Sequence, residues 1–276
     1  MDFDKYLDLI ECGKEQEAIL YRMSYIPDVL YKYYPLFENK NEYDIKESEK
    51  RLSTLQRGEV YLSSLNQFND PFEGKAFVFE KDEHAPEGLK KENLENFVSE
   101  MNNKWRIACF ANPDEKYQNM PMWAYYANYH RGFCVEYELL DFQKAIFYPV
   151  SYNPLRVEGN AFVGVLIMGL LNMYNQKIDS SQMSDELNLY NHLTHLSLTC
   201  KHMSWQHEKE YRALLPFDFG SYLPLSPRKI YLGMNCTKEH EQRILEIVQN
   251  FPNCELYKMT DTLDNCNFCL KSIRLK

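Results

Sequence analysis

The sequence has too few basic residues, relative to acidic ones, to form a broad basic surface. It holds 31 Lys and Arg against 40 Asp and Glu, which gives a formal net charge of −9. A protein that binds nucleic acid nonspecifically needs an excess of positive charge on its surface to attract phosphates. The composition therefore carries no strong signal for nucleic-acid binding, although a local basic groove remains compatible with it.

Long hydrophobic runs and a secretory leader are also missing. The most apolar stretch, residues 161–171, is too short to span a bilayer. Residues 1–4 are acidic, the opposite of the positively charged start of a signal peptide. We therefore expect a cytoplasmic protein without a membrane partner.

The eight cysteines do not form a recognisable metal or disulfide pattern. Cys266 and Cys269 have C-x-x-C spacing, but no second C-x-x-C and no nearby histidine pair completes a zinc site. In a cytoplasmic protein such cysteines are reduced, and most of them act as small buried apolar residues. The sequence predicts no metal site.

Internal repeats, low-complexity tracts and linkers are absent, while aromatic residues are abundant. The 276 residues include 21 Tyr and 16 Phe, and this length is enough to bury one large core. Strand patterns alternate irregularly with helical patterns along the chain. This order predicts a single α+β domain with a mixed, mostly antiparallel sheet flanked by helices.

Several boundaries follow from hydrophobic periodicity. Residues 2–22 are predicted to form one amphipathic helix, within an N-terminal segment 1–28 that packs on a domain formed by residues 29–276. A helical hairpin is expected at about residues 158–201. Residues 146–152 are expected to be the hairpin partner of a strand at residues 132–137.

Residues 205–212 concentrate more chemistry than any other stretch. They read W-Q-H-E-K-E-Y-R, just ahead of an apolar run. If a strand begins at Lys209, a period of two places Glu208, Glu210 and Arg212 on one face. Such a row is costly to bury unless each charge has a partner. An exposed row of alternating charge at a strand edge is the plain alternative.

Three further stretches supply candidate site residues. Lys32 and Tyr33 lie in the strand-like segment L-Y-K-Y-Y-P, where a lysine is placed to hold a phosphate or carboxylate. Asn69 and Asp70 suit a turn, since both side chains can bond their own backbone. The short helix that begins near residue 120 brings Trp123, Tyr126 and His130 close together. The two tryptophans, Trp123 and Trp205, are also typical core residues.

These stretches together resemble a large bacterial and phage family of unknown function. The hallmarks of that family are an F-N-D-P-F-E turn, found here at residues 68–73, and W-x-x-E-x-E-x-R, found at 205–212. Between them lie C-F at residues 109–110, M-W-x-x-Y at 122–126 and H-R-G at 130–132. The resemblance covers residues 30–235 and implies no chemistry by itself. A toxin or phage-defence effector would suit such a family.

The order of the parts also resembles that of the ADP-ribosyltransferases. The resemblance implies that Lys32 or Tyr33 binds NAD, that Ser63 and Ser64 line a nicotinamide pocket, and that Glu210 stabilises the oxocarbenium ion. Glu208 would then orient the acceptor. The sequence departs from that pattern because it has no Ser-Thr-Ser triplet and no His or Arg at the first position.

This resemblance gives the first functional prediction, an ADP-ribosyltransferase or NAD glycohydrolase acting on a nucleotide, with a macromolecular acceptor left open. Breaking an N-glycosidic bond builds positive charge that a fixed carboxylate stabilises. Trp123 and Tyr126 would stack on the rings of NAD, and Arg212 would hold its pyrophosphate or keep Glu210 ionised.

Two other functions are compatible with the same residues. In a metal-dependent nuclease or phosphodiesterase, the carboxylates would converge on Mg²⁺ and His130 or His207 would act as base; these carboxylates are Asp70, Glu73, Glu208 and Glu210. In a noncatalytic module that binds a nucleotide or peptide through an aromatic pocket, Glu208 and Arg212 would form an internal ion pair. The structural residues would then be Asn69, Asp70, Trp123 and Trp205.

Overall fold

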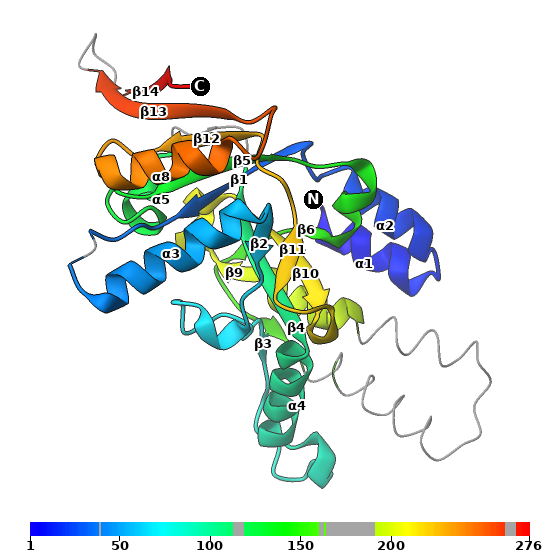
Figure 1. Cartoon of the computed structure of the whole chain (residues 1–276). Helices are drawn as coiled ribbons and strands as arrows, with labels where there is room; N and C mark the ends of the chain where they lie inside the picture. Colours follow the sequence, from blue (N-terminus) through cyan, green and yellow to red (C-terminus); the bar gives the residue numbers. More distant parts are fainter. Residues whose placement is uncertain (39, 113–118, 160–162, 164–190, 263–268) are drawn as a thin grey trace.

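An eight-stranded sheet forms the centre of the computed structural model (Figure 1). The structure describes the chain except residues 39, 113–118, 160–162, 164–190 and 263–268. The strands of the sheet, in spatial order, are β14 (Cys269–Arg274), β13 (Glu255–Thr262), β12 (Lys229–Leu232), β5 (Phe133–Glu138), β1 (Val29–Tyr34), β4 (Trp105–Ala111), β10 (Glu210–Pro216) and β6 (Phe147–Pro149).

Antiparallel pairing dominates this sheet. Among its neighbouring pairs, β12 and β13 run parallel and the others run antiparallel. The parallel pair is joined by helix α8 (Lys238–Val248), because a crossover connection is needed to bring a second strand back in the same direction. The prediction of a single α+β domain with a mixed, mostly antiparallel sheet is confirmed.

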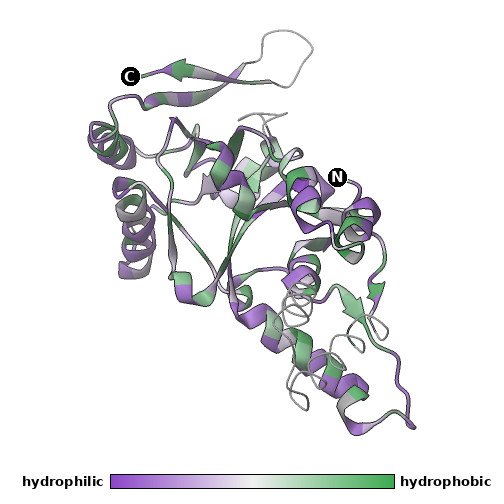
Figure 2. Cartoon of the chain, turned by 90° about the vertical axis from the view of Figure 1, so that its right-hand side faces the viewer, coloured by the Kyte–Doolittle hydropathy of each residue, from purple (hydrophilic) through white to green (hydrophobic). Residues whose placement is uncertain are grey.

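One face of the sheet packs against α3 (Glu42–Gln56) and α8. Leu52 and Leu55 of α3 and Ile244 of α8 join alternate strand residues, such as Leu30 and Val135, in one buried apolar cluster. Both helices have capped beginnings, since Asn41 accepts a hydrogen bond from the Asp44 amide and Thr237 accepts one from that of His240. The helices show hydrophobic and hydrophilic residues side by side in Figure 2, as expected for amphipathic helices at a surface.

The opposite face of the sheet packs against α5 (Met120–Tyr126). Trp123 of α5 is fully buried, and its ring meets that of Tyr33 edge-on at 5.2 Å between centroids. Tyr31, Cys134 and Tyr231 belong to the same apolar cluster. Because side chains alternate across a strand, this face also receives Glu210 and Arg212 of β10. The α5 face therefore carries the charged residues.

The N-terminal segment contains two helices instead of the single one predicted. Helix α1 (Phe3–Glu11) is capped at its C-terminus by Cys12, and α2 (Glu15–Met23) follows after Gly13, whose φ of 69° is left-handed. Glycine adopts this conformation without steric cost and so breaks the helix. The pair packs beside β6 (Figure 1), where buried Arg22 donates hydrogen bonds to the carbonyl oxygens of Phe147 and Ala145.

The predicted pairing of residues 146–152 with the strand at 132–137 is wrong. β5 lies between β1 and β12, while β6 pairs with β10. β7 (Ser151–Asn153) instead pairs with β9 (Cys200–His202) in parallel. The single-sequence pattern identified an apolar extended segment, but it carried no signal for which strand would pair with it.

The helical hairpin expected at about residues 158–201 lies mostly outside the described residues; of its expected span, residues 191–199 are helical. This helix packs near α4 (Lys91–Asn103), since Asn102 Nδ2 donates to Ser197 Oγ at 3.0 Å. The smaller elements are β2 (Glu59–Tyr61), β3 (Phe77–Val78), β8 (Val157–Glu158), β11 (Tyr222–Pro224) and the 3₁₀ helices η1 (Leu65–Gln67), η2 (Glu87–Leu89), η4 (Asp141–Ile146), η5 (Met203–Glu208) and η6 (Phe217–Phe219). Across the described part of the chain, no helix has the length and apolar character needed to cross a bilayer.

Candidate functional site

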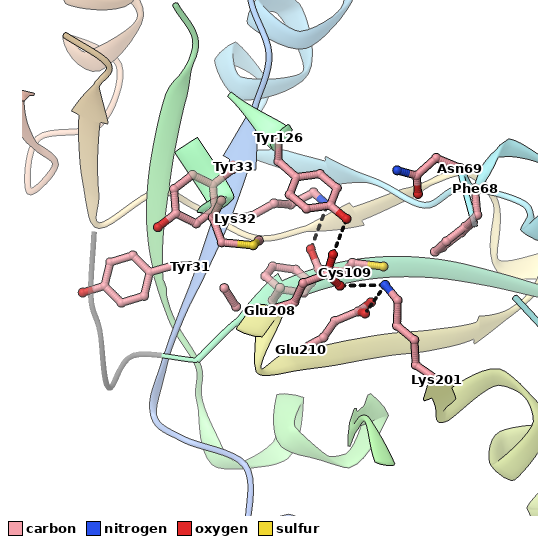
Figure 3. A pocket seen from close by; sticks show the side chains of 13 residues that line it. Tyr31, Lys32, Tyr33, Phe68, Asn69, Cys109, Tyr126, Lys201, Glu208 and Glu210 are labelled. Atoms are coloured by element: carbon pink, nitrogen blue, oxygen red, sulfur yellow. Dashed lines mark hydrogen bonds and ion pairs between the residues drawn. The ribbon is translucent and has the colours of Figure 1, made fainter. Parts of the chain in front are cut away.

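A pocket opens where β1 and β4 separate. The two strands have one aligned pair, Tyr31 with Ala111, and beyond it the Lys32 ammonium donates to the Cys109 carbonyl oxygen at 2.9 Å. The pocket encloses about 510 Å³ including its mouth. Figure 3 shows its lining, which comprises Tyr31, Lys32, Tyr33, Phe68, Asn69, Cys109, Phe110, Ala111, Met122, Tyr126, Lys201, Glu208 and Glu210.

Two carboxylates reach this pocket by different routes. Glu210 opens β10 opposite Ala111, and the period of two places it on the same face as Arg212, as predicted. The strand begins at Glu210, however, and Glu208 lies in the preceding 3₁₀ helix. Lys209 between them has a left-handed backbone with φ of 44°. This reversal, not strand alternation, returns the Glu208 side chain to the site.

A buried group of charged side chains forms one wall of the site, and we call it the ion cluster. Figure 3 shows three of its members, Lys201, Glu208 and Glu210. Its members are Glu73, Lys201, Glu208, Glu210 and Arg212, each at most 7% exposed. Lys201 Nζ lies 2.6 Å from Glu208 Oε2 and 3.3 Å from Glu210 Oε2. Lys201 Nζ also lies 3.4 Å from Glu73 Oε1. One ammonium group thus holds three carboxylates together.

Arg212 is the second cation of the ion cluster and is fully buried. Its two terminal nitrogens each lie 2.8 Å from an oxygen of Glu73, a bidentate pair. Its Nε donates to Glu210 Oε1 at 2.8 Å. In this structure Arg212 therefore fixes two carboxylates and does not face the pocket.

The charges of the ion cluster do not balance. Three carboxylates face two cations, so full ionisation leaves an excess of one negative charge. Burial raises the pKa of Glu208, and the charge of Glu210 raises it further. Burial opposes ionisation of Glu210 too, but Arg212 and Lys201 outweigh it and lower the pKa of Glu210 to about 2. Of these two carboxylates, Glu208 is therefore the one whose ionisation the excess negative charge makes less favourable.

Neutral hydrogen-bonding groups complete the environment of the two carboxylates. The Tyr126 hydroxyl donates to Glu208, and burial together with Glu208 raises the pKa of Tyr126 so that it stays a donor. The Tyr152 hydroxyl accepts from the Glu210 amide at 2.8 Å. Burial also raises the pKa of the Cys109 thiol, which is hydrogen-bonded to Glu210. These groups orient the carboxylates without adding charge.

Lys32 has a different environment from Lys201. Its ammonium lies over the rings of Phe110 and Tyr34, at 5.4 and 5.6 Å from their centroids. Burial lowers the pKa of Lys32. Among its contacts within the described residues, none is a carboxylate at ion-pair distance. Lys32 is therefore a cation at the pocket whose charge is not neutralised by a close partner.

The structure gathers some predicted residues at the pocket and places others elsewhere. Glu208, Glu210, Lys32, Tyr33, Asn69 and Tyr126 line it. Trp123 lies in the core beneath it, and the His130 ring stacks on Trp123 with centroids 5.7 Å apart. Burial lowers the pKa of His130. Both residues thus support the pocket from behind.

The serines and Asp70 have structural partners outside the lining. The backbone of Ser63 exchanges hydrogen bonds of 2.8 Å with Ile107 of β4, and the Ser64 amide donates to Gln67 Oε1 at 3.0 Å at the start of η1. Asp70 Oδ1 accepts from the Phe72 amide at 2.9 Å. Asp70 thereby braces the turn that positions Asn69 at the pocket and Glu73 in the ion cluster.

Lys201 was not identified from the sequence, and Glu73 was considered there only as a possible metal ligand. Lys201 precedes the W-x-x-E motif in β9, within the segment that the sequence assigned to a helix. In the sequence, the signal for Lys201 was only a lone lysine four residues ahead of Trp205. In the structure, its ammonium lies 4.8 Å from the centre of the Trp205 ring. Glu73 had a clearer signal, as the glutamate that ends the F-N-D-P-F-E turn.

The same contacts bear on metal binding. The carboxylate oxygens of the ion cluster are engaged by Lys201 and Arg212 at 2.6 to 3.4 Å, which leaves cations where Mg²⁺ would lie. In the part of the chain that the structure describes, no group of three or more His, Cys, Asp or Glu side chains is arranged to hold a metal ion. The donor set fits a protein cation better than a metal.

Comparisons with known proteins locate one relationship. Residues 122–213, about a third of the chain, match the model of a family described as a protein of unknown function, DUF2971. This segment includes most of α5, all of β5 and β6, Lys201 and both carboxylates of the pocket, but not Glu73. No curated protein and no solved structure matches the chain. Over the segment that carries most of the site, the chain is therefore similar to an uncharacterised family.

Proposed function

We propose that the pocket cleaves the N-glycosidic bond of a nucleotide, with NAD as the substrate and water or a macromolecule as acceptor. The observation that carries the proposal is the pair Glu208 and Glu210. They share Lys201 at one wall of the pocket, and their pKa values are moved in opposite directions. Two neighbouring carboxylates with separated pKa values are suited to divide acid–base work from charge stabilisation.

Each carboxylate has a distinct role in this reaction. As the bond between the anomeric carbon and the nicotinamide nitrogen breaks, nicotinamide leaves with the bonding electrons and the ribose ring becomes an oxocarbenium ion. Glu210, kept ionised by Arg212, stabilises that positive charge together with the excess negative charge of the ion cluster. Glu208 accepts the proton of the attacking hydroxyl group, for which a raised pKa is favourable.

Other lining residues support a nucleotide ligand. Tyr33 and Tyr126 offer aromatic surface at the pocket. Lys32 offers a cation without a close carboxylate partner, suited to a phosphate group. The resemblance to ADP-ribosyltransferases implied, from sequence order, that Lys32 or Tyr33 binds NAD, that Glu210 stabilises the oxocarbenium ion and that Glu208 orients the acceptor.

Release of nicotinamide from NAD tests the proposal. Wild type, Glu210→Gln and Glu208→Gln would be incubated with NAD, with and without cell lysate to supply acceptors. We expect release by wild type and a loss of at least about 100-fold in Glu210→Gln. Glu241→Gln, which alters an ion pair with Lys258 outside the pocket, is the control and should retain full activity. No release by wild type under either condition would refute cleavage of NAD.

A noncatalytic nucleotide-binding module is the second candidate. The observation that favours it is the complete internal pairing of Arg212, which has the form of a structural ion network. This candidate predicts that NAD or another nucleotide raises the melting temperature while no nicotinamide is released. Loss of that shift in Lys32→Met would then locate the nucleotide in the pocket.

A role as a toxin or phage-defence effector would follow from consumption of NAD in the cell. Induced expression of wild type would then lower cellular NAD and slow growth, whereas Glu210→Gln at an equal protein level would do neither. Equal growth and equal NAD content in the two cultures would argue against this role.

A further inference from the structure

A second hollow adjoins the pocket, and we call it the aromatic shelf. It is formed by Phe37, Tyr125, Tyr129, Trp205 and His207 and encloses about 1260 Å³ including its mouth. Asn69 and Tyr126 line both the aromatic shelf and the pocket, so the two spaces are neighbours. A ligand that reaches Glu208 beside Tyr126 therefore lies next to the shelf.

Two rings of the aromatic shelf are largely exposed, those of Tyr125 at 68% and Tyr129 at 67%. Their faces are therefore open to a ligand. The rings of Tyr125 and Trp205 each lie 6.2 Å from that of His207. The Tyr125 ring meets that of His207 at 61° and the Trp205 ring is tilted from it by 32°, so the three rings border a hollow against whose walls a flat ring can pack.

Tyr129 lies in a left-handed turn that the surrounding fold holds in place. Asn128, Tyr129 and His130 have φ values of 46°, 55° and 64°, three consecutive left-handed residues without a glycine. The conformation is uncommon for residues other than glycine, and strained segments cluster at ligand-binding sites. Asn128 Nδ2 donates to the Leu36 carbonyl oxygen at 2.8 Å, and Asn235 Nδ2 donates to that of Tyr129 at 3.0 Å. The surrounding fold thus fixes an exposed tyrosine in one position.

Charge links the shelf to the ion cluster. The Lys201 ammonium lies 4.8 Å from the centre of the Trp205 ring while bonding Glu208. The Tyr126 hydroxyl bonds Glu208 as well, and its neighbour Tyr125 belongs to the shelf. Lys201 therefore contacts both Glu208 and a ring of the shelf, and Tyr126, which also bonds Glu208, is next in sequence to a second ring of the shelf.

We propose that the aromatic shelf binds the purine base of the dinucleotide whose other half occupies the pocket. The proposal rests on the proposed function, since it assigns the two ends of NAD to two neighbouring spaces. Stacking on aromatic side chains tolerates any flat base, and loss of one ring weakens such binding by about tenfold or more. The five members of the shelf include no Asp, Glu, Lys or Arg, which suits a neutral base.

AMP is the probe for this proposal, because it carries the base without the reactive nicotinamide bond. Binding would be measured by calorimetry for wild type, Tyr129→Ala and Tyr125→Ala, with ribose 5-phosphate as the ligand without a base. We expect AMP to bind wild type, ribose 5-phosphate to bind at least about tenfold more weakly, and each variant to lose about tenfold in affinity for AMP. Tyr43→Ala removes a tyrosine of equal exposure, 68%, on α3 and should bind like wild type.

The outcomes separate this proposal from the proposed function. Glu210→Gln should bind AMP normally while losing cleavage of NAD. AMP binding without cleavage of NAD by wild type would refute the function and leave the shelf supported. Unchanged AMP affinity in the folded Tyr129→Ala and Tyr125→Ala variants would overturn the shelf, even if NAD is cleaved. Tighter binding of an oligoadenylate than of AMP would overturn its assignment to the base of the dinucleotide.

Discussion

Replacing each pocket carboxylate by its uncharged isostere should have opposite effects on stability. The pKa of Glu210 is lowered from 4.5 to about 2, so the folded state favours its ionised form. Each unit of pKa shift corresponds to about 1.36 kcal/mol, which gives about 3 kcal/mol at neutral pH. Glu210→Gln keeps the shape and removes this stabilisation, so the free energy of unfolding should fall by about 3 kcal/mol.

Glu208→Gln should instead be neutral or stabilising. The pKa of Glu208 is raised, so folding stabilises its protonated form relative to the ionised form, and the amide resembles the protonated form. The substitution also removes the excess negative charge of the ion cluster. The amide side chain that replaces the carboxylate retains an oxygen that can accept a hydrogen bond from Lys201, whose ammonium lies 2.6 Å from Glu208 in the wild type.

The pH dependence of the two contributions also differs in sign. A depressed pKa, as at Glu210, contributes stability above pH 4.5 that is lost as the pH falls toward 2. A raised pKa, as at Glu208, contributes stability below pH 4.5 that is lost as the pH rises through the folded-state pKa. The deficit of Glu210→Gln relative to wild type should therefore shrink between about pH 5 and about pH 3.

Urea denaturation followed by tryptophan fluorescence measures these differences. Wild type, Glu210→Gln and Glu208→Gln would be unfolded at pH 7 and again at several lower pH values. Equal destabilisation by the two substitutions at pH 7 would refute the prediction. It would mean that the fold stabilises the ionised forms of Glu208 and Glu210 to the same extent. A Glu210→Gln deficit that does not change with pH would refute the assigned pKa.

Three further predictions test the surroundings of the pocket. Lys201→Met leaves three carboxylates facing one guanidinium and should cost about 3–5 kcal/mol at pH 7 in urea denaturation, with partial recovery at pH 5; full stability at pH 7 would contradict this. Tyr126→Phe removes a hydrogen bond that lowers the pKa of Glu208, so the acid limb of nicotinamide release should move to higher pH; an unmoved limb would separate Glu208 from proton transfer. Gly132→Ala would place a Cβ 1.9 Å from the Tyr34 carbonyl oxygen and should lower the free energy of unfolding by about 3 kcal/mol or more. Thermal denaturation at fixed pH would detect this as a lower melting temperature, and an unchanged melting temperature would contradict it.

Local periodicity was sufficient to predict several elements of the fold. The strand that contains Tyr33, the short helix that begins near residue 120 and the strand at residues 132–137 were expected where β1, α5 and β5 lie. Glu210 and Arg212 were expected on one face because side chains alternate along a strand, and they do bond each other. These features depend on residues close in sequence, which a single chain reveals directly.

Features that depend on distant segments were not predictable in this way. Arg212 bonds Glu73 across 139 residues, and no local pattern of either residue specifies that pairing. Tyr6 likewise contacts His192 across 186 residues. The neighbours of β5 follow from the order of strands in the sheet, which the alternation of apolar residues leaves open.

The predicted aromatic residues differ in whether they are buried in the core or line the pocket. Trp123 and Tyr126 share α5 and were both predicted to stack on a ligand. Their directions differ because three residues fall short of a full helical turn of about 3.6 residues, so Trp123 enters the core while Tyr126 meets Glu208. The adjacent Tyr125 and Tyr129 were not predicted as site residues, because the left-handed turn that exposes Tyr129 has no glycine to mark it.

The position of β10 in the sheet has a consequence for the order of folding. This strand lies between β4 and β6, both of which are synthesised earlier, and it supplies Glu210 and Arg212. Until the ribosome has released residue 216, β4 keeps an unpaired edge and Glu73 lacks its guanidinium partner. A nascent chain stopped before that point would hold an open edge in the middle of its future sheet. Completion of the ion cluster and pairing of the second edge of β4 therefore both require β10, whereas β12, β13 and β14 join the sheet from residues that are made later still.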